Sequence, residues 1–383
     1  MQYEPRSATE WAADTSLFPI WDPSVPFPRM EEMCDPEVIT QVVINRGELD
    51  GWHYLHEASI MWHKDRFYAC WANNPELEGL NYDEIVRGCT SFDGIHWTEP
   101  TIWVQAPALG AHSFNHPLLF SNGEKLVGFF VAWYGEAHEP TTELFVLNEE
   151  TGVWEHQEGS SLPWLVPFGT PQKMADGNWI LSGENYWYQS TVAISHGDDI
   201  LHWDLVPIPK PEDFTLHYPE SAVILDGDRL INFCRPDERL RMQTAPISIS
   251  HDCGRTWEPM QLSNFPISDS QPFAGKLSTG QNYLVTSSLD GERRHLLTIA
   301  VTGPEGGMFK RVLKVRHQAW PARRLFGGFT QLDGSKTETY VGKSTEWSYP
   351  NAYERNGNLY ITYSQGKEDC VLSIIPIEAL KAE

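Results

Sequence analysis

The stretch HEASIMWHKDRFYACW, residues 56–71, sets the pattern of this chain: an apolar strand, a tight polar turn and a second apolar strand. Short apolar runs bounded by Gly, Asn and Asp are typical of β-strands joined by hairpin turns. Five later stretches repeat this hairpin: NHPLLFSNGEKLVGFFVAW (115–133), TPQKMADGNWILSG (170–183), ESAVILDGDRLINFC (220–234), QPFAGKLSTGQNYLVTS (271–287) and PNAYERNGNLYITYS (350–364). Self-similarity at a period of about 50 residues is typical of propeller blades, so the sequence predicts an all-β propeller.

Most of these hairpins are followed by a second strand pair that closes on a tryptophan, and two hairpins make a four-stranded blade. The second pairs lie at 84–100, 143–157, 191–206 and 247–260, with a version lacking Trp at 295–315. The last hairpin has one further strand, DCVLSIIPI, and we expect VITQVVI (38–44) to supply its outer partner and close the ring. We favour six blades; the stretch 319–347 is either a large loop or a degenerate seventh blade.

Composition limits the classes of function. No Pro/Ser-rich linker divides the chain, so we expect an N-terminal arm, residues 1–37, that wraps one propeller domain, residues 38–383. The formal net charge of −24 argues against nucleic acid or an acidic membrane face as a partner. The N-terminus does not resemble a secretory signal, and there is no apolar run of about 18 residues. The six cysteines form no C-x-x-C pair, so we expect reduced core residues in a cytoplasmic protein.

One motif identifies a group of propellers. SHDCGRTW, residues 250–257, fully matches the pattern Ser-x-Asp-x-Gly-x-x-Trp, and SFDGIHW, residues 91–97, matches it with one residue missing. Asp accepts backbone N–H bonds in such a turn, Gly supplies a positive φ and Trp packs on the blade, so these residues should stabilise turns rather than catalyse. The motif resembles the Asp-box, or BNR repeat, of the sialidase-like propellers. This resemblance covers the chain from residue 53 onward and implies a six-bladed β-propeller of sialidase type.

The first blade departs from true sialidases, which carry an Arg-Ile-Pro motif there and three arginines that bind the substrate carboxylate. Residues 51–71 contain no Arg-Ile-Pro, so sialic acid is a doubtful substrate. The histidine-rich sequence looks closer to a branch that includes rhamnosyl-glucuronate hydrolases and lyases and ulvan lyases, which use axial His, Tyr and Arg. That similarity implies an oligosaccharide substrate, with a uronate in the lyase version.

The beginnings of the six hairpins are expected to converge, because the first strand of each blade lines the propeller axis. Counting seven residues back from the turn glycines of the second, third and fourth hairpins reaches His116, Thr170 and Glu220, which should then be equivalent. We predict His56, His116, Glu220 and Tyr218 as catalytic residues, because His titrates near neutral pH and burial can raise the pKa of a Glu carboxyl group. The alternative is that these polar groups only satisfy backbone groups along a wet channel.

A second set of residues is predicted to bind substrate. Arg235 ends an inner strand and is placed to hold a carboxylate bidentately, the alternative being a surface ion pair with Asp237 or Glu238. The other candidates for substrate binding lie at hairpin starts, at strand ends or in the long late loop. They are Glu57, Gln172, Gln271, Tyr349, Trp71 and Arg324. The alternative to a binding role is that these side chains pack in the core or are only solvated.

The sequence leaves three functions open. The first is hydrolysis of a terminal glycosidic bond, with His116 or Glu220 as the acid. The second is β-elimination next to a uronate, with Arg235 neutralising the carboxylate, His56 or His116 as the base and Tyr218 serving the leaving group. The third is a propeller that binds glycans without catalysis. No cofactor is required and catalytic zinc is not expected, because HxxH at 53–56 is not HExxH; a structural calcium on the axis stays open.

Overall fold

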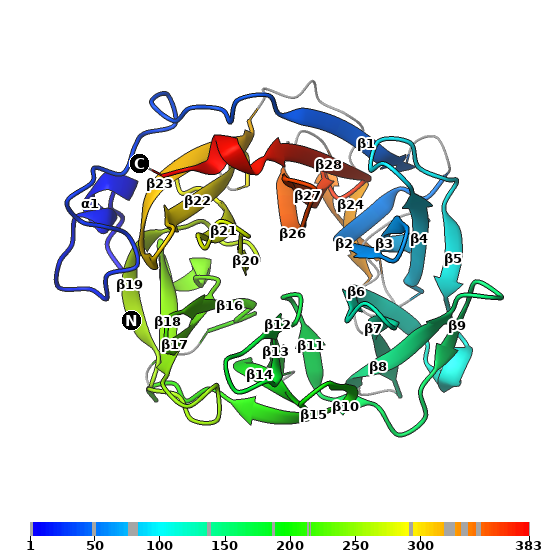
Figure 1. Ribbon diagram of the computed structural model, residues 1–383. Helices are drawn as coiled ribbons and strands as arrows, with labels where there is room; N and C mark the ends of the chain where they lie inside the picture. The colour runs from blue at the N-terminus through cyan, green and yellow to red at the C-terminus, as the bar shows by residue number, and fades with distance from the viewer. Residues whose placement is uncertain are drawn as a thin grey trace.

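The computed structural model describes residues 3–47, 51–75, 83–135, 139–185, 188–212, 214, 216–290, 294–317, 326–330, 336–341 and 346–382. Six antiparallel sheets surround a central axis like the blades of a propeller (Figure 1). The innermost strand of each sheet lines the axis, and the chain then runs outward through the blade. The predicted six-bladed β-propeller is therefore confirmed.

The first half of the chain forms three blades, in each of which the strands succeed one another from the axis outward. Blade 1 contains β2 (Tyr54–His63), β3 (Arg66–Asn74), β4 (Ile85–Ser91) and β5 (Thr101–Val104). Blade 2 contains β6 (Ser113–Ser121), β7 (Leu126–Tyr134) and β8 (Glu139–Asn148), with β9 (Val153–His156) and β10 (Leu162–Pro163) both paired to β8. Blade 3 contains β11 (Leu165–Pro167) and β12 (Gln172–Lys173), both paired to β13 (Trp179–Asn185), then β14 (Gln189–His196) and β15 (Asp199–Pro207).

The second half of the chain forms the other three blades. Blade 4 contains β16 (Ser221–Asp226), β17 (Arg229–Cys234), β18 (Thr244–Ser250) and β19 (Gln261–Pro266). Blade 5 contains β20 (Phe273–Lys276), β21 (Asn282–Ser287), β22 (Leu297–Gly303) and β23 (Gly306–Arg316). Blade 6 contains β26 (Trp347–Arg355), β27 (Asn358–Gln365), β28 (Asp369–Pro376) and β1 (Thr40–Arg46).

The ring closes through strands from opposite ends of the chain. β1 pairs antiparallel with β28, from Thr40 opposite Ile374 to Arg46 opposite Asp369. The expectation that a segment near the N-terminus completes the last blade is thus confirmed. The helical elements of the described chain are short: α1 (Ala8–Ala12), η1 (Ala108–Gly110), η2 (Glu238–Leu240) and η3 (Ile377–Leu380).

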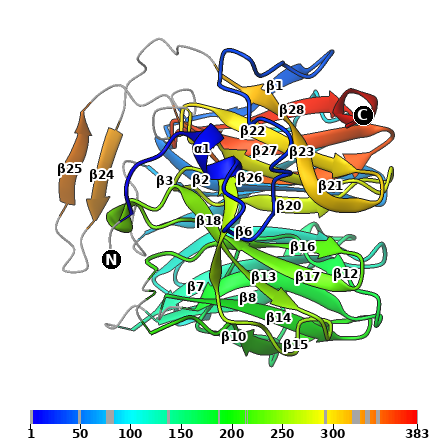
Figure 2. The ribbon, with the colours of Figure 1, turned by 90° about the vertical axis from the view of Figure 1, so that its left-hand side faces the viewer.

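One hairpin differs from the sequence prediction, and a second decides between the alternatives left open for residues 319–347. In blade 3 the inner strand is interrupted, since β11 and β12 pair with different parts of β13. In the stretch 319–347, β24 (Phe326–Thr330) and β25 (Lys336–Val341) pair with each other and stand apart from the six blades (Figure 2). That stretch therefore does not supply a seventh blade.

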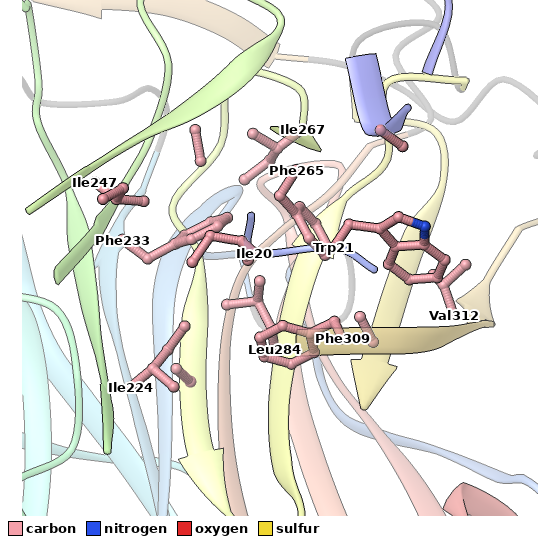
Figure 3. Close-up of a cluster of buried hydrophobic side chains, with 14 of the residues drawn as sticks. Ile20, Trp21, Ile224, Phe233, Ile247, Phe265, Ile267, Leu284, Phe309 and Val312 are labelled. Carbon is pink, nitrogen blue, oxygen red and sulfur yellow. The ribbon is translucent and has the colours of Figure 1, made fainter. Parts of the chain in front are cut away.

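The N-terminal arm packs on the outside of blades 4 and 5. Phe18 forms a bridge with Ser263 in β19, and Trp21 forms one with Phe309 in β23. The Trp21 ring is fully buried and lies 6.2 Å from the Phe265 ring, in a cluster that joins the arm to both blades (Figure 3). Burial of such large apolar side chains is the main force holding the arm in place.

The Asp-box turns have the predicted structural role. Asp252 Oδ1 accepts a backbone N–H four residues later at 2.8 Å, and the Trp257 indole donates to the carbonyl of Gly254 at 2.8 Å. Trp97 and Trp203 donate in the same way to a carbonyl three residues earlier. These turns join the third and fourth strands of their blades, so they lie on the face opposite the beginnings of the inner strands.

Candidate functional site

Three inner strands carry the same irregularity near their beginnings. In β2, β6 and β26 the pairing with the second strand shifts at Glu57, His116 and Tyr349. These residues have φ of +58°, +42° and +56°, a left-handed conformation that costs about 1–3 kcal/mol for a residue other than glycine. Such bulges re-aim side chains, and here all three residues line one small pocket, together with Phe168 and Gln271.

A buried network of three side chains connects blade 6 with blade 4. The Tyr349 hydroxyl donates a hydrogen bond to Glu220 Oε1, and Arg235 Nη1 lies 3.0 Å from Glu220 Oε2. Arg235 Nη1 also donates to the Tyr349 hydroxyl at 3.4 Å, and Arg235 Nη2 lies 3.9 Å from Asp269. Glu220 and Tyr349 are 3% and 7% exposed, so water contributes little to solvating this network.

The backbone explains why Glu220 and Arg235 meet. β16 begins at Ser221 and β17 ends at Cys234, and these two residues pair with each other. The Arg235 N–H donates to the Glu220 carbonyl at 2.8 Å, so the ladder extends by one more pair. Side chains directly opposite in an antiparallel pair lie on the same face of the sheet, which places the carboxylate beside the guanidinium.

Burial and charge fix the protonation states of this network. Burial raises the pKa of Tyr349 well above its ordinary value and the neighbouring Glu220 raises it further, so the phenol is neutral. Burial opposes the charge on Arg235, but attraction to Glu220, Tyr349 and Asp269 prevails and raises its pKa, so the guanidinium stays charged. The network thus contains a neutral phenol beside a carboxylate that an arginine holds in place.

A second carboxyl group, Glu184, lies next to this network and was missed by the sequence analysis. It belongs to β13, its Oε2 is buried, and no hydrogen-bond partner for that atom exists among the described residues. Burial raises the pKa of Glu184 well above its ordinary value, and the charge of Glu220 adds to the effect. A buried carboxyl group with a raised pKa is typical of a general acid in catalysis.

His56 lies directly behind Tyr349. The two rings are 4.1 Å apart between centroids, and His56 Nδ1 lies 2.8 Å from the Ser364 hydroxyl. Burial lowers the pKa of His56 well below its ordinary value, and the positive charge of Lys367 adds to the effect. His56 is therefore a neutral imidazole that supports Tyr349, and it does not line the cavity.

His116 reaches the cavity and is paired with Glu57. Its Nε2 lies 3.2 Å from Glu57 Oε1, and its backbone N–H donates to Glu57 Oε2 at 2.6 Å. Although this carboxylate is close, burial dominates and lowers the pKa of His116 to about 3. An imidazole with so low a pKa carries no acidic proton to donate at neutral pH, which disfavours His116 as the acid.

The predicted equivalence of His116 and Glu220 is wrong. His116 lies within the bulge of β6, whereas Glu220 precedes a regular ladder in β16 and β17. The residues that correspond to His116 are Glu57 and Tyr349, which share the bulge and the positive φ. Counting from the turn glycines takes no account of the bulge, and the turn after β6 is also two residues longer than the turn after β16.

Several predicted binding residues have other roles in the structure. Trp71 is fully buried and its indole donates to Asn73 Oδ1 at 2.6 Å, so the expected stacking of Trp71 on a sugar is wrong. Gln172 Nε2 donates to the Val223 carbonyl at 2.7 Å and ties blade 3 to blade 4. Gln271 lines the cavity and donates to the Phe168 carbonyl at 3.2 Å.

The arginines near the site agree only in part with the sequence predictions. Arg235 is buried and pairs with Glu220, and the structure shows no ion pair between it and Asp237; the side chain of Glu238 lies outside the described residues. The predicted binding residue Arg324 lies outside the described residues. Arg294 was not singled out from the sequence, yet its guanidinium lies 5.5 Å from the centre of the Tyr349 ring and its Nε donates to the Asp269 carbonyl at 3.2 Å. The only sequence signal was its place in the charged run GERRH before β22.

Among the described residues, no group of three or more His, Cys, Asp or Glu side chains is arranged to hold a metal ion. No helix in the described part of the chain is long and apolar enough to cross a membrane. The six cysteines are free thiols; four are buried, but Cys34 is exposed, so the expectation of core positions is wrong for this residue.

Comparison with known proteins identifies the family. The model of a protein family described as "BNR repeat-like domain" matches residues 65–361. The chain belongs to this family. Among solved structures, this family member superposes on a protein of unknown function from Dyadobacter fermentans with a TM-score of 0.59 and 15% identity, over 88% of this chain and 98% of that one.

Two solved sialidases are also similar. A Hadza microbial sialidase gives a TM-score of 0.63 at 12% identity, over 89% of this chain and 69% of that one. Trypanosoma rangeli sialidase in complex with the inhibitor DANA gives a TM-score of 0.58 at 13% identity, over 91% of this chain and 59% of that one. The chain thus spans about three fifths of the trypanosomal protein, and the similarity shows a shared fold. None of the curated proteins matches the sequence.

Proposed function

We propose that this BNR-family propeller is a glycoside hydrolase that cleaves a terminal glycosidic bond of an oligosaccharide in its axial cavity. The observation that supports this most is the hydrogen bond from the Tyr349 hydroxyl to Glu220, with Arg235 on the other carboxylate oxygen. A nucleophile held against a base that is itself oriented by a third group is the arrangement expected for covalent catalysis. Sialidases use a tyrosine nucleophile in place of a carboxylate, so the chemistry has precedent in this fold.

The proposed reaction has two steps. Tyr349 Oη attacks the anomeric carbon while its proton passes to Glu220 Oε1; the bond to the leaving oxygen breaks, and Glu184 supplies the proton that this oxygen needs. Water then attacks the anomeric carbon and gives its proton to the Glu184 carboxylate; the bond from this carbon to Tyr349 Oη breaks, and Tyr349 recovers its proton from Glu220. Two displacements at one carbon retain the anomeric configuration.

The cations beside Tyr349 favour a sugar that carries a carboxylate. Arg235 Nε is buried and has no hydrogen-bond partner among the described residues. Arg294 lies over the Tyr349 ring, and its ion pair with Glu346 is a long one, at 4.0 Å. Planar guanidinium groups bind carboxylates well, so we propose a terminal uronic or related acidic sugar as the substrate.

The test is digestion of a glycan panel that includes neutral and carboxylated terminal sugars, with mass spectrometry of the products. We expect release of the acidic terminal sugar with a mass gain of one water. Release of neutral sugars alone would overturn the acidic substrate. No release from any member of the panel would overturn the hydrolase.

β-Elimination next to a uronate is the second candidate, and one observation favours it. His116 is a neutral imidazole that lines the cavity, so it can remove a proton from a sugar whose carboxylate is neutralised by Arg235. The panel distinguishes the two reactions, because elimination leaves an unsaturated, ultraviolet-absorbing product with no mass gain.

A further inference from the structure

Two large aromatic rings are exposed beside the candidate site. Tyr188 and Tyr218 are 39% and 43% exposed, and their rings meet edge to face at 5.6 Å between centroids with an interplanar angle of 88°. The His217 ring lies 5.1 Å from Tyr188 on another side. We call Tyr188 and Tyr218 the tyrosine pair.

Both residues of the tyrosine pair have a strained backbone. Their rings are exposed, so packing in the core does not explain the strain. Tyr188 has φ +56° and Tyr218 has φ +55°, and a left-handed residue other than glycine costs about 1–3 kcal/mol. A glycine would adopt either conformation without that cost. Strain of this kind is typical of functional positions, where it places a side chain for a ligand.

Hydrogen bonds hold the tyrosine pair in position. Asp237 is 4% exposed, and its Oδ2 accepts the His217 backbone N–H at 2.9 Å and lies 3.1 Å from His217 Nδ1. The Tyr188 N–H donates to the Asn185 carbonyl at 3.1 Å, and Lys210 Nζ donates to the Tyr188 carbonyl at 3.2 Å. The rings therefore present a defined surface to solvent.

This surface adjoins the buried network of Glu220 and Arg235. The Arg235 guanidinium lies 5.7 Å from the centre of the Tyr218 ring, and Glu220 follows Tyr218 by two residues. Glu184, the proposed acid, also acts on Tyr218 electrostatically. The exposed tyrosine pair thus lies on the solvent side of the groups that act on the leaving oxygen.

We propose that Tyr188 and Tyr218 form a stacking subsite for the sugar on the leaving-group side of the scissile bond. The inference rests on the proposed function, because it places the terminal sugar in the axial cavity and the next sugar on the rim. The apolar face of a pyranose packs on an aromatic ring, and the tyrosine hydroxyl can bind a sugar hydroxyl. The substrate is then at least a disaccharide, and Tyr218 is a stacking residue rather than a catalytic one.

The test measures binding in a Tyr349→Phe background, in which turnover is blocked. Calorimetric titrations use free glucuronic, galacturonic and N-acetylneuraminic acids, and the di- to tetrasaccharides that each of them terminates. The double substitution Tyr188→Ala/Tyr218→Ala should weaken binding of oligosaccharides about tenfold and leave the free acids unaffected. Single Tyr→Phe changes at these positions should keep most of the affinity, because the ring face remains.

Phe92→Ala is the matched control. Phe92 is an aromatic ring with 68% exposure in an Asp-box turn on the opposite face, so its removal should change no affinity. Equal weakening for free acids and oligosaccharides, no weakening, or no binding of any probe by the parent would each overturn the stacking subsite. Failure of the proposed function is a separate result: hydrolysis that survives Tyr349→Phe refutes the nucleophile, while the titrations still report on the tyrosine pair.

Discussion

Replacing Tyr349 with Phe removes one hydroxyl group from the centre of the network and nothing else. The ring, its contact with His56 and its left-handed backbone are compatible with phenylalanine. The variant loses the hydrogen bond to Glu220 and the 3.4 Å contact with Arg235. It also loses the atom that we propose as the nucleophile.

The expected effects on stability and on activity differ widely. A hydrogen bond to a charged group contributes about 1.5–3 kcal/mol, which lowers Tm by only a few degrees in a protein of this size. Loss of a nucleophile lowers kcat by about 10³- to 10⁶-fold, or about 4–8 kcal/mol in the activation barrier. The structure therefore predicts a folded, slightly less stable and almost inactive protein.

The assay compares Tyr349→Phe with Tyr363→Phe by thermal unfolding and by turnover of the best substrate from the glycan panel. Tyr363 is buried in the adjacent strand β27, and its hydroxyl lies 2.8 Å from Ser373 Oγ and donates to Gln41 Oε1 at 3.2 Å, away from the cavity. This control removes the same atom from the same blade, so it should shift Tm by a similar amount and retain full activity. Activity in Tyr349→Phe within tenfold of the parent, or an equal loss in both variants, would refute the reasoning.

Three other variants test contacts elsewhere in the molecule. Glu184→Gln should slow hydrolysis of substrates with poor leaving groups by about 10²- to 10⁴-fold and spare activated aryl glycosides, because only the former need an acid; equal losses across leaving groups would contradict this. Burial lowers the pKa of His116 from 6.5 to about 3. Between these two pH values the unfolded chain binds a proton that the folded chain does not, so the free energy of unfolding falls as the pH drops. His116→Gln should therefore reduce the stability lost between pH 7 and pH 5, measured by denaturant unfolding, by about 2 kcal/mol, and an unchanged loss would exclude the buried neutral imidazole. Trp21→Ala should lower the free energy of unfolding by about 3–5 kcal/mol, measured by thermal or denaturant unfolding, because the ring is fully buried against Phe27. The control Glu31→Ala changes an exposed residue of the arm and should leave the free energy of unfolding almost unchanged; equal effects of the two variants would argue against a packed arm.

The fold could be predicted because its signal is local and repeated. Each hairpin carries its own apolar strands and turn residues, and the Asp-box tryptophans mark the outer turns, so the six blades and the closure of β1 on β28 followed from pattern alone. The bulges at Glu57, His116 and Tyr349 did not follow, because an extra residue within a strand leaves the apolar pattern almost unchanged.

The candidate site could be predicted in part. His56, Glu220, Arg235 and Tyr349 lie at hairpin ends, so strand topology alone brought them near the axis. Glu184 belongs to the second strand of a blade whose inner strand is interrupted, and its approach to Glu220 depends on packing between blades. The opposite error was made for Trp71, whose position at a strand end suggested exposure although the neighbouring blade covers it.

The placement of the first 46 residues has a consequence for synthesis on the ribosome. The arm binds blades 4 and 5 and β1 completes blade 6, so both segments must wait for strands that are translated long after them. Blades 1 to 3 can assemble meanwhile, since their strand pairings are all internal. Trp21 lacks its native partners until blades 4 and 5 are translated, and β1 lacks its partner until translation reaches β28. This interval is therefore the one most exposed to aggregation and to chaperone capture.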